Sequence, residues 1–363
     1  MRIGILTYHR TNNYGALLQA IATRVYLQQL GHEAYYIDYW PEYHKNSYAI
    51  WDWGEFKRQG LIRKIKFLFS GVINYKGKIK RINSFTPFLE QYIIPFCKPF
   101  NDRETYDVII YGSDQIWRKQ KGLGNKFNPV YFGQHIQNCN HKIAYAASMG
   151  DVNLNENDIE DLASWLSDFD AIGVRENNIL DVLKTLQLKN AQLTVDPTML
   201  LDAFEWDKVL KPKRLIDKPY AVVYQLYECF DMKEIKKFCK IHNLRLVVIP
   251  AFYSIRNCTS EFSVVSPFDF ISLIKYADFS FISSFHGLVF SIIYGVQFFA
   301  SFSNASDRAK TLLSNLGLQD RFYQPKSELP LNYSNINYAN VHEKLNVIKK
   351  ESFEFLDKIN AYD

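Results

Sequence analysis

The chain has 363 residues, of which 47% are hydrophobic and 22% are charged, and its formal net charge is +5. This length and composition suit a globular protein with two domains and exclude a disordered or fibrous chain. No apolar run approaches the length of about 18 residues that crosses a bilayer, so no membrane-spanning segment is expected.

The N-terminus and the cysteines favour a cytoplasmic protein. The sequence begins directly with a strand pattern and lacks the apolar stretch and cleavage site of a signal peptide. Its five cysteines are scattered, without a Cys-x-x-Cys pair, so neither a disulfide framework nor a zinc site is expected. We therefore expect a protein of the reducing cytoplasm that holds no metal.

Strand and helix patterns alternate along the first half of the chain. Strands are predicted at residues 2–7, 33–39, 107–111 and 142–148, and helices at residues 15–30 and 157–169. Residues 41–98 interrupt the pattern as an irregular insertion rich in basic and aromatic residues. Alternating strands and helices predict a parallel sheet with both faces covered.

The second half repeats this pattern. Strands are predicted at residues 171–174, 193–195, 220–225, 244–249, 279–282 and 297–302, and helices at residues 178–186, 232–242, 268–276, 286–294, 307–316 and 340–359. We therefore expect two Rossmann-like domains, residues 1–168 and 169–335, followed by a closing helix within residues 336–363. Ligands bind at the carboxyl ends of parallel strands, so an active site is expected in a cleft that both domains face.

A basic segment, residues 57–81, carries nine Lys or Arg and no Asp or Glu. One interpretation is a solvated surface insertion. The other is a membrane-surface contact, because apolar residues alternate with the basic ones as in an interfacial helix. These apolar residues are Leu61, Ile62, Ile65, Phe67, Leu68 and Phe69. No recognition motif accompanies the segment, so nucleic acid is not an expected partner.

Polar clusters follow the predicted strands directly. They begin at Tyr8, Gly112, Ser148, Arg175, Asp196 and Ser283, and the one at Ser148 ends with Asp151. Such positions form the ligand crevice of a parallel sheet, although a single cluster also serves as a turn or a cap. The loop before the first helix lacks the Gly-x-Gly-x-x-Gly and Walker patterns, so no dinucleotide or ATP site of those kinds is indicated.

Three residues in these clusters have side chains suited to chemistry. His286 opens a helix that Ser283 or Ser284 can cap, and the helix dipole favours both an anion and a neutral imidazole there. Such a His can transfer protons, or it can be a structural residue of the cap. Arg175 can bind a carboxylate or phosphate, or form a salt bridge between domains. Asp114 is a candidate base, a ligand for sugar hydroxyls, or a turn residue.

Together the motifs resemble the polysaccharide pyruvyl transferase family. The resemblance runs from residue 2 to about residue 322, and the order and spacing of the motifs make it specific. The matching stretches are residues 3–9, 13–19, 111–117, 144–150, 174–176, 195–198, 283–287 and 308–321.

The resemblance implies a fold similar to that of B-type glycosyltransferases. It also implies transfer of pyruvate from phosphoenolpyruvate, a co-substrate, to two hydroxyls of a sugar, which forms a cyclic ketal without any cofactor. Such sugars belong to bacterial capsular, exopolysaccharide or cell-wall polymers. The expected acceptor is a sugar or a lipid-linked oligosaccharide, which would bring the basic segment to the inner face of the membrane.

The resemblance also implies roles for individual residues. Arg175 and His286 fall on donor-binding and catalytic positions of the family. With the motifs around them, we assign catalysis to His286 and Asp114. The donor is assigned to the second domain, through Arg175, Ser283, Ser284, Gly287 and Arg308. The acceptor is assigned to the first domain, through Asn13, Tyr14, Gly15, Gln115 and Trp117.

One position departs from the common family pattern. Many members carry Arg two positions before the His, where this chain has Ser284, as in a Ser-Phe-His-Gly variant of the family. Arg308 is expected to supply the missing charge at the same sheet edge, or else to pair with Asp307 or Asp320 at the surface. Two rival functions remain, a glycosyltransferase with a nucleotide-sugar donor and a non-catalytic carbohydrate-binding protein.

Overall fold

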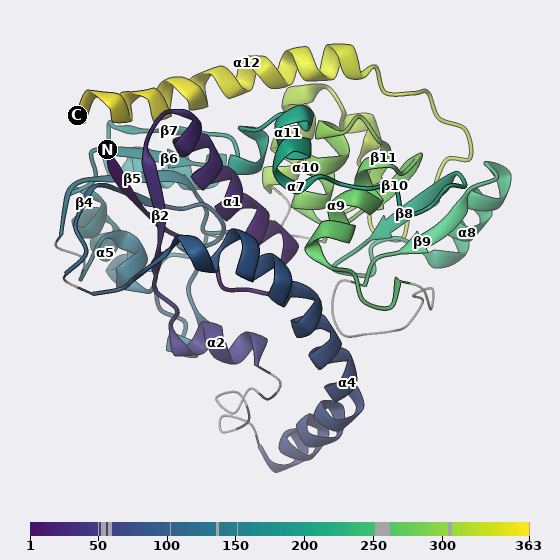
Figure 1. The fold of residues 1–363 in the computed structure, drawn as a ribbon, viewed down its shortest axis with the longest axis horizontal. Coiled ribbons are helices and arrows are strands. Elements are labelled where there is room, and N and C mark those ends of the chain that lie inside the picture. The colour runs from purple at the N-terminus through teal and green to yellow at the C-terminus, as the bar shows by residue number, and fades with distance from the viewer. Residues whose placement is uncertain are drawn as a thin grey trace. The chain divides into compact units, whose positions relative to one another are not determined.

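The computed structural model describes residues 1–49, 51, 56, 60–101, 103–135, 138–150, 152–250, 262–303 and 307–362. For Ser47 and part of residues 61–73 it describes the backbone alone. The chain is an α/β protein that divides into two compact units, each built on its own parallel sheet (Figure 1). Unit 1 comprises Met1–Phe69, Leu89–Leu200 and Ile348–Asp363, and unit 2 comprises Ser70–Phe88 and Leu201–Val347.

Unit 1 holds a seven-stranded sheet in the order β3-β2-β1-β4-β5-β6-β7, and every pair is parallel. The strands are β1 (Arg2–Leu6), β2 (Glu33–Asp38), β3 (Cys97–Pro99), β4 (Tyr106–Tyr111), β5 (Cys139–Ala147), β6 (Ala171–Val174) and β7 (Ala191–Leu193). The strand order reverses between β1 and β4, which makes their carboxyl ends the topological switch point where ligands bind in such sheets.

The helices of unit 1 lie in the connections between its parallel strands. They are α1 (Tyr14–Gln29), α2 (Glu42–Tyr48), α5 (Glu156–Leu166) and α6 (Asn177–Thr185). The central strands are apolar on both faces, and Ile3, Ile5, Val108 and Ile110 are fully buried. This pattern of continuous apolar strands agrees with a sheet covered on both sides.

The domain boundary expected after residue 168 is wrong. β6 pairs with β5 and β7 pairs with β6, so both strands extend the first sheet instead of starting a second one. Unit 1 therefore reaches Leu200, and the last helix, α12 (Tyr338–Asp357), divides between the units at Val347 and Ile348. Sequence periodicity identifies the strands but carries no information on which sheet they join.

Unit 2 holds a four-stranded parallel sheet in the order β11-β10-β8-β9. Its strands are β8 (Tyr220–Tyr224), β9 (Arg245–Val248), β10 (Phe279–Ile282) and β11 (Gln297–Ala300). Its helices include α7 (Ala203–Leu210), α8 (Met232–Ile241), α9 (Pro267–Lys275), α10 (Phe285–Ile293) and α11 (Asp307–Leu316). Here the strand order reverses between β8 and β10, so the second switch point lies at the carboxyl ends of these two strands.

The insertion expected to be irregular is largely helical. Beside α2 it contains α4 (Leu61–Tyr92), a 32-residue helix that continues through Pro87. Arg81, Phe85 and Phe88 recur at helical spacing and are buried, and Phe88 packs edge-on against Phe268 with 4.9 Å between the ring centroids. Among the described residues, no helix is both long enough and apolar enough to cross a membrane.

Candidate functional site

The switch point of unit 1 is formed by the loops after β1 and β4. Asn13 caps α1, and its side-chain oxygen accepts hydrogen bonds from the backbone N–H groups of Gly15 (3.0 Å) and Ala16 (3.4 Å). After β4, Gly112 has φ 137°, and a Cβ there would lie 2.0 Å from the carbonyl oxygen of Tyr145. Only glycine fits this position, so the Gly-Ser-Asp motif brings Asp114 to the edge of the sheet.

Asp114 is half-buried at this edge and has φ 62°. Its Oδ1 accepts a hydrogen bond from the backbone N–H of Gln115 at 2.8 Å. Burial raises the pKa of Tyr8 and of Tyr131 well above the usual value, and the charge of Asp114 raises both further. The carboxylate thus lies among aromatic side chains, where it is able to accept a hydrogen bond from a hydroxyl of a ligand.

Two residues assigned to the acceptor belong to the core. Trp117 is fully buried, donates its indole N–H to the carbonyl of Tyr131 (3.0 Å), and stacks on Phe132. Tyr14 is also fully buried in the first turn of α1. Asn13 is exposed and Gln115 is half-buried, whereas Gly15 is buried. The acceptor assignments of Trp117 and Tyr14 are therefore corrected, because neither ring reaches solvent.

Arg175 lies in unit 1, immediately after β6, and not in the second unit as expected. Its guanidinium forms a buried ion pair with Asp196, with side-chain exposures of 2% and 0%. Asp196 in turn accepts hydrogen bonds from the Thr198 N–H (3.0 Å) and hydroxyl (2.6 Å). The Asp-Pro-Thr motif therefore holds Arg175, a role that sequence reasoning did not assign to it.

Further carboxylates surround this guanidinium. Burial lowers the pKa of Arg175, but the charges of Asp196, Glu176 and Asp114 outweigh it and raise that pKa. Glu176 is buried and accepts a hydrogen bond from the Ser148 hydroxyl at 2.6 Å. The structure thus brings Asp114, Arg175, Glu176 and Asp196 together at one edge. Asp151, at the end of the Ser148 cluster, lies outside the described residues.

In unit 2, three of the predicted donor residues, Ser283, Ser284 and Gly287, lie at the switch point between β8 and β10. The Ser283 hydroxyl accepts a hydrogen bond from the backbone N–H of Leu226 at 2.8 Å, so it joins the two loops and does not cap α10. Ser284 is the N-cap residue, and in the described part of the chain its side chain makes no capping hydrogen bond. His286 and Gly287 follow in the first turn of α10 and are buried.

Arg308 lies over the ring of Phe285, with its guanidinium carbon 4.8 Å from the ring centroid. The same ring meets the imidazole of His286 edge-on at 5.4 Å. Arg308 is the second residue of α11, the helix that follows β11, and it is half-buried. The side chain therefore lies beside the first turn of α10, whereas Asp320, one of its two expected surface partners, pairs with Arg321. A role in donor binding stays a prediction.

Gly287 has a packing role that the sequence did not reveal. A Cβ at this position would approach Ile282 to 3.0 Å and Tyr224 to 3.1 Å. Glycine therefore allows the first turn of α10 to lie close against β8 and β10. This close approach positions the helix start directly at the carboxyl ends of the two strands.

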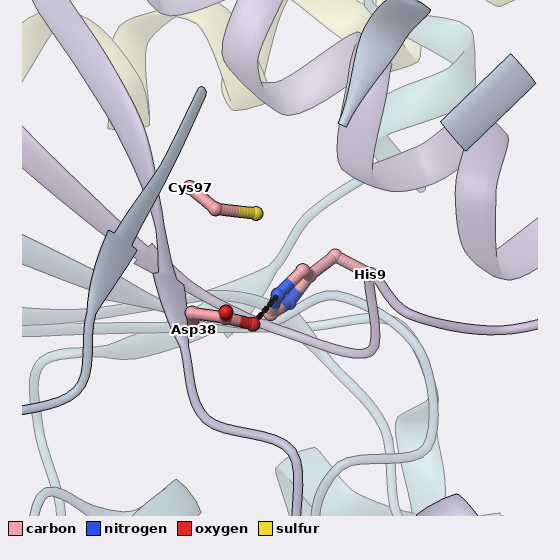
Figure 2. Close-up of side chains that lie close together, drawn as sticks. All are labelled: His9, Asp38 and Cys97. Carbon is pink, nitrogen blue, oxygen red and sulfur yellow. Dashed lines mark hydrogen bonds and ion pairs between the residues drawn. The ribbon is translucent and has the colours of Figure 1, made fainter. Parts of the chain in front are cut away.

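A third polar group in unit 1 has the residue types of a metal site. His9, Asp38 and Cys97 bring one potential ligand atom each within 4.8 Å of one another, and Figure 2 shows the His9 ring bonded to the Asp38 carboxylate beside the thiol. The His9 Nε2 to Asp38 Oδ1 distance is 3.2 Å. However, Arg10 donates to both Asp38 oxygens, at 2.5 and 2.7 Å, and the Cys97 thiol donates to the Ile93 carbonyl.

The electrostatics of this group argue against a cation. Burial alone would raise the pKa of Asp38, but hydrogen bonds from His9 and Arg10 hold it well below its usual range. Burial and the Asp38 charge raise the pKa of the Cys97 thiol to about 12, so the thiolate that a metal needs is disfavoured. The group is therefore a hydrogen-bonded ion-pair network that fixes the loop after β1.

Sequence reasoning assigned no role to three aromatic residues next to Asp114. The imidazole of His44, from α2, stacks on Tyr8 with 4.5 Å between centroids and 20° between planes. Tyr131 meets Tyr8 edge-on at 5.2 Å. Burial lowers the pKa of His44 to about 4, although the negative charge of Asp114 acts to raise it. His44 and Tyr131 lie outside the strand-following clusters, so no sequence signal pointed to them.

Comparison with solved structures gives distant likenesses. A UDP-GlcNAc 2-epimerase of Methanocaldococcus jannaschii, in complex with UDP-GlcNAc and UDP, is 10% identical with a TM-score of 0.44, and the match covers 96% of this chain and 100% of that one. UGT89C1 of Arabidopsis thaliana, complexed with UDP-L-rhamnose, is 11% identical with a TM-score of 0.48, and the match covers 99% and 98%. Likeness at this level carries no information on ligands.

The sequence itself gives a family. No curated protein matches the chain. The family model for polysaccharide pyruvyl transferase matches residues 13–306, a range that runs from the N-cap of α1 past β11 and contains the loops after β4, β8 and β10. This chain belongs to the polysaccharide pyruvyl transferase family.

Proposed function

We propose that this protein transfers pyruvate from phosphoenolpyruvate to a sugar of a bacterial capsular polysaccharide or exopolysaccharide and forms a cyclic ketal. The family match over residues 13–306 is the observation that carries this proposal. The placement of His286 in the first turn of α10 is compatible with it, because a helix N-terminus favours an anionic donor.

In the proposed reaction two sugar hydroxyls bond in turn to C2 of phosphoenolpyruvate, and phosphate leaves. A sugar hydroxyl adds to C2 of phosphoenolpyruvate and gives its proton to a base, and C3 takes up a proton to become a methyl group. The C2–O bond to phosphate then breaks, and the second hydroxyl bonds to C2 while its proton passes to a base. His286 is our choice for the proton transfers, and Asp114 for holding the acceptor hydroxyl.

Donor binding needs positive charge, because phosphoenolpyruvate carries about three negative charges. Ser284 brings none, and Arg175 is already paired with Asp196. Arg308, over the ring of Phe285, is the cation we assign to the donor, with the first-turn N–H groups of α10. Arg308→Ala should therefore raise the KM for phosphoenolpyruvate more than it lowers kcat.

The reaction is tested by incubating the protein with phosphoenolpyruvate and candidate sugars, and by measuring phosphate release and the product mass. We expect phosphate and a product heavier by one pyruvate less one water, and His286→Ala should suppress both. Nucleotide release from a nucleotide sugar would instead support a glycosyltransferase. Sugar binding without either release would support a non-catalytic carbohydrate-binding protein.

A further inference from the structure

Phe285 contacts both side chains to which we assign chemistry in unit 2. The guanidinium carbon of Arg308 lies 4.8 Å from the centroid of its ring, and the imidazole of His286 meets the same ring edge-on at 5.4 Å. The ring is buried, with 6% of the residue exposed, whereas Arg308 is half-buried. A buried ring therefore supports a cation that solvent still reaches.

Arg308 and His286 come from different helices that start at the same edge of the sheet. β10 and β11 are parallel neighbours, with Ile282 opposite Ala300, so α10 and α11 both follow strands that end level with each other. The helix α10 is buried along its whole length, and close-packed side chains have little freedom to move. The Phe285 ring is thus a fixed point on α10 against which a side chain of α11 is held.

Contact with an aromatic face holds a guanidinium in a different way from a salt bridge. A cation is attracted to the negative face of the ring, and this attraction uses none of its N–H donors. The salt bridge of Arg175 with Asp196, in contrast, uses a donor and compensates the charge. The Phe285 contact therefore restrains the Arg308 side chain without compensating its charge. A restrained side chain loses less rotamer freedom when it binds an anion.

We propose that Phe285 is a positioning residue that acts through Arg308. Its ring holds the guanidinium beside the first turn of α10, where the guanidinium N–H groups bind a carboxylate or phosphate oxygen of phosphoenolpyruvate. The inference rests on the proposed function, which supplies this donor. Phe285 does not itself touch the donor, so its aromatic face matters and its apolar volume does not.

Direct binding tests the aromatic face without catalysis, by calorimetric titration of phosphoenolpyruvate into the full chain without a sugar. Phe285→Leu keeps an apolar side chain but removes the ring, and it should weaken binding about threefold to 30-fold through the loss of the cation–π contact. Phe285→Tyr keeps the ring face and should bind within about twofold of the parent protein. Phe285→Met also lacks a ring and replaces Phe285→Leu if that variant does not fold. No binding by the parent protein, or unchanged binding by the variants without a ring, would overturn the proposal.

Phe290→Leu is the matched control, because it removes another buried ring from the same helix. The Phe290 ring packs edge-on against Trp206, with 5.1 Å between the ring centroids. This variant should lower the thermal midpoint and leave the Kd for phosphoenolpyruvate unchanged. If Phe285→Leu and Phe290→Leu weaken binding equally, the loss of packing is the cause and Phe285 has no positioning role.

Coupling to Arg308 decides how Phe285 acts. In a protein that carries Arg308→Gln, the further change Phe285→Leu should leave the Kd unchanged, because the ring then has no cation to hold. In the parent background, Phe285→Leu should raise the KM for phosphoenolpyruvate and change kcat by less than about twofold. Additive losses of affinity, or a fall in kcat alone, would mean that the ring acts through packing or through His286, and would overturn the proposal. If phosphoenolpyruvate binds and the variants behave as expected, but no sugar elicits phosphate release, the proposed reaction fails and the positioning role stands.

Discussion

Arg175 and Asp196 form the most deeply buried ion pair among the described residues whose exposure is given. An isolated charge in this environment is costly, so removal of one partner should destabilise the fold strongly. We expect Asp196→Asn to lower the free energy of unfolding by about 3–5 kcal/mol, measured by urea denaturation.

A surface pair in the same unit supplies the control. Asp181 lies 3.8 Å from Lys184, and both side chains are more than half exposed. Asp181→Asn should change the free energy of unfolding by about 0.5 kcal/mol or less, because water screens such pairs. Similar effects of the two substitutions would show that Arg175 tolerates the loss of Asp196.

The Asp38 network should make stability depend on pH. The pKa of the Asp38 carboxyl is lowered in the folded state, so the ionised carboxylate stabilises the fold at neutral pH. This contribution is fully present above the ordinary carboxyl pKa of about 4 and is lost as the pH falls below it. Asp38→Asn should therefore cost more stability at pH 7 than at pH 3, as measured by the urea midpoints at both values. An equal cost at both would mean that the charge of Asp38 contributes nothing.

His286 gives the sharpest residue-level test of the mechanism. His286→Ala should reduce kcat by a factor on the order of 100 or more, as expected when a proton-transfer group is lost. The thermal midpoint should change little if the imidazole serves chemistry more than packing. Activity within a few-fold of the parent would leave His286 as a structural residue of the helix start.

At the scale of elements, the turn after β4 depends on Gly112. A Cβ there would overlap the Tyr145 carbonyl, and φ is positive. Gly31 also has a positive φ, but a Cβ there would meet nothing within 4 Å. Gly31→Ala should therefore cost only about 1 kcal/mol of backbone strain, whereas Gly112→Ala should cost several times more and displace Asp114. Comparable thermal midpoints for the two variants would contradict this.

Local sequence patterns predicted the positions of the strands better than they predicted which strands pair in one sheet. The strands predicted at residues 107–111 and 279–282 correspond to β4 and β10. A short apolar run that is followed directly by a polar turn is typical of a buried strand, so this pattern could be recognised from the sequence. The sheet that β6 joins depends on contacts distant in sequence, so the boundary was misplaced. For α4, the sequence suggested a helix only as one of two interpretations of residues 57–81, because Pro87 and the charged residues masked the full length and the buried positions of this helix.

The candidate site shows the same limit. Asp114 was chosen as a candidate from the sequence because the Gly-Ser-Asp turn follows a strand directly, and its role stays a prediction. Trp117, three residues later, was assigned to the acceptor, but its side chain points into the core, and sequence does not reveal that direction. His44 comes from an inserted helix, and only the fold stacks it on Tyr8.

At the scale of the whole molecule, charge is unevenly distributed. The net charge is +5, whereas residues 57–81 alone carry nine basic residues. Lys57 lies outside the described residues, and so do the side chains of Leu61, Ile62, Ile65 and Phe69. Arg81, the last residue of the segment, is buried and donates to the Pro250 carbonyl, so it is part of the fold. Leu68, Tyr75, Lys76 and Lys80 are exposed.

This exposed basic surface leads to our last prediction, association with anionic membranes. Each Lys near such a surface contributes roughly 1 kcal/mol, so Lys76→Gln with Lys80→Gln should weaken vesicle binding by about 30-fold. Lys236→Gln with Lys237→Gln on α8 changes the net charge equally at exposed positions and should have a smaller effect. Co-sedimentation with vesicles containing phosphatidylserine at low salt measures both, and added salt should weaken binding because it shortens the range of the attraction. If the two double variants lose binding equally, net charge alone drives association; if the parent protein does not bind, the segment is a solvated insertion.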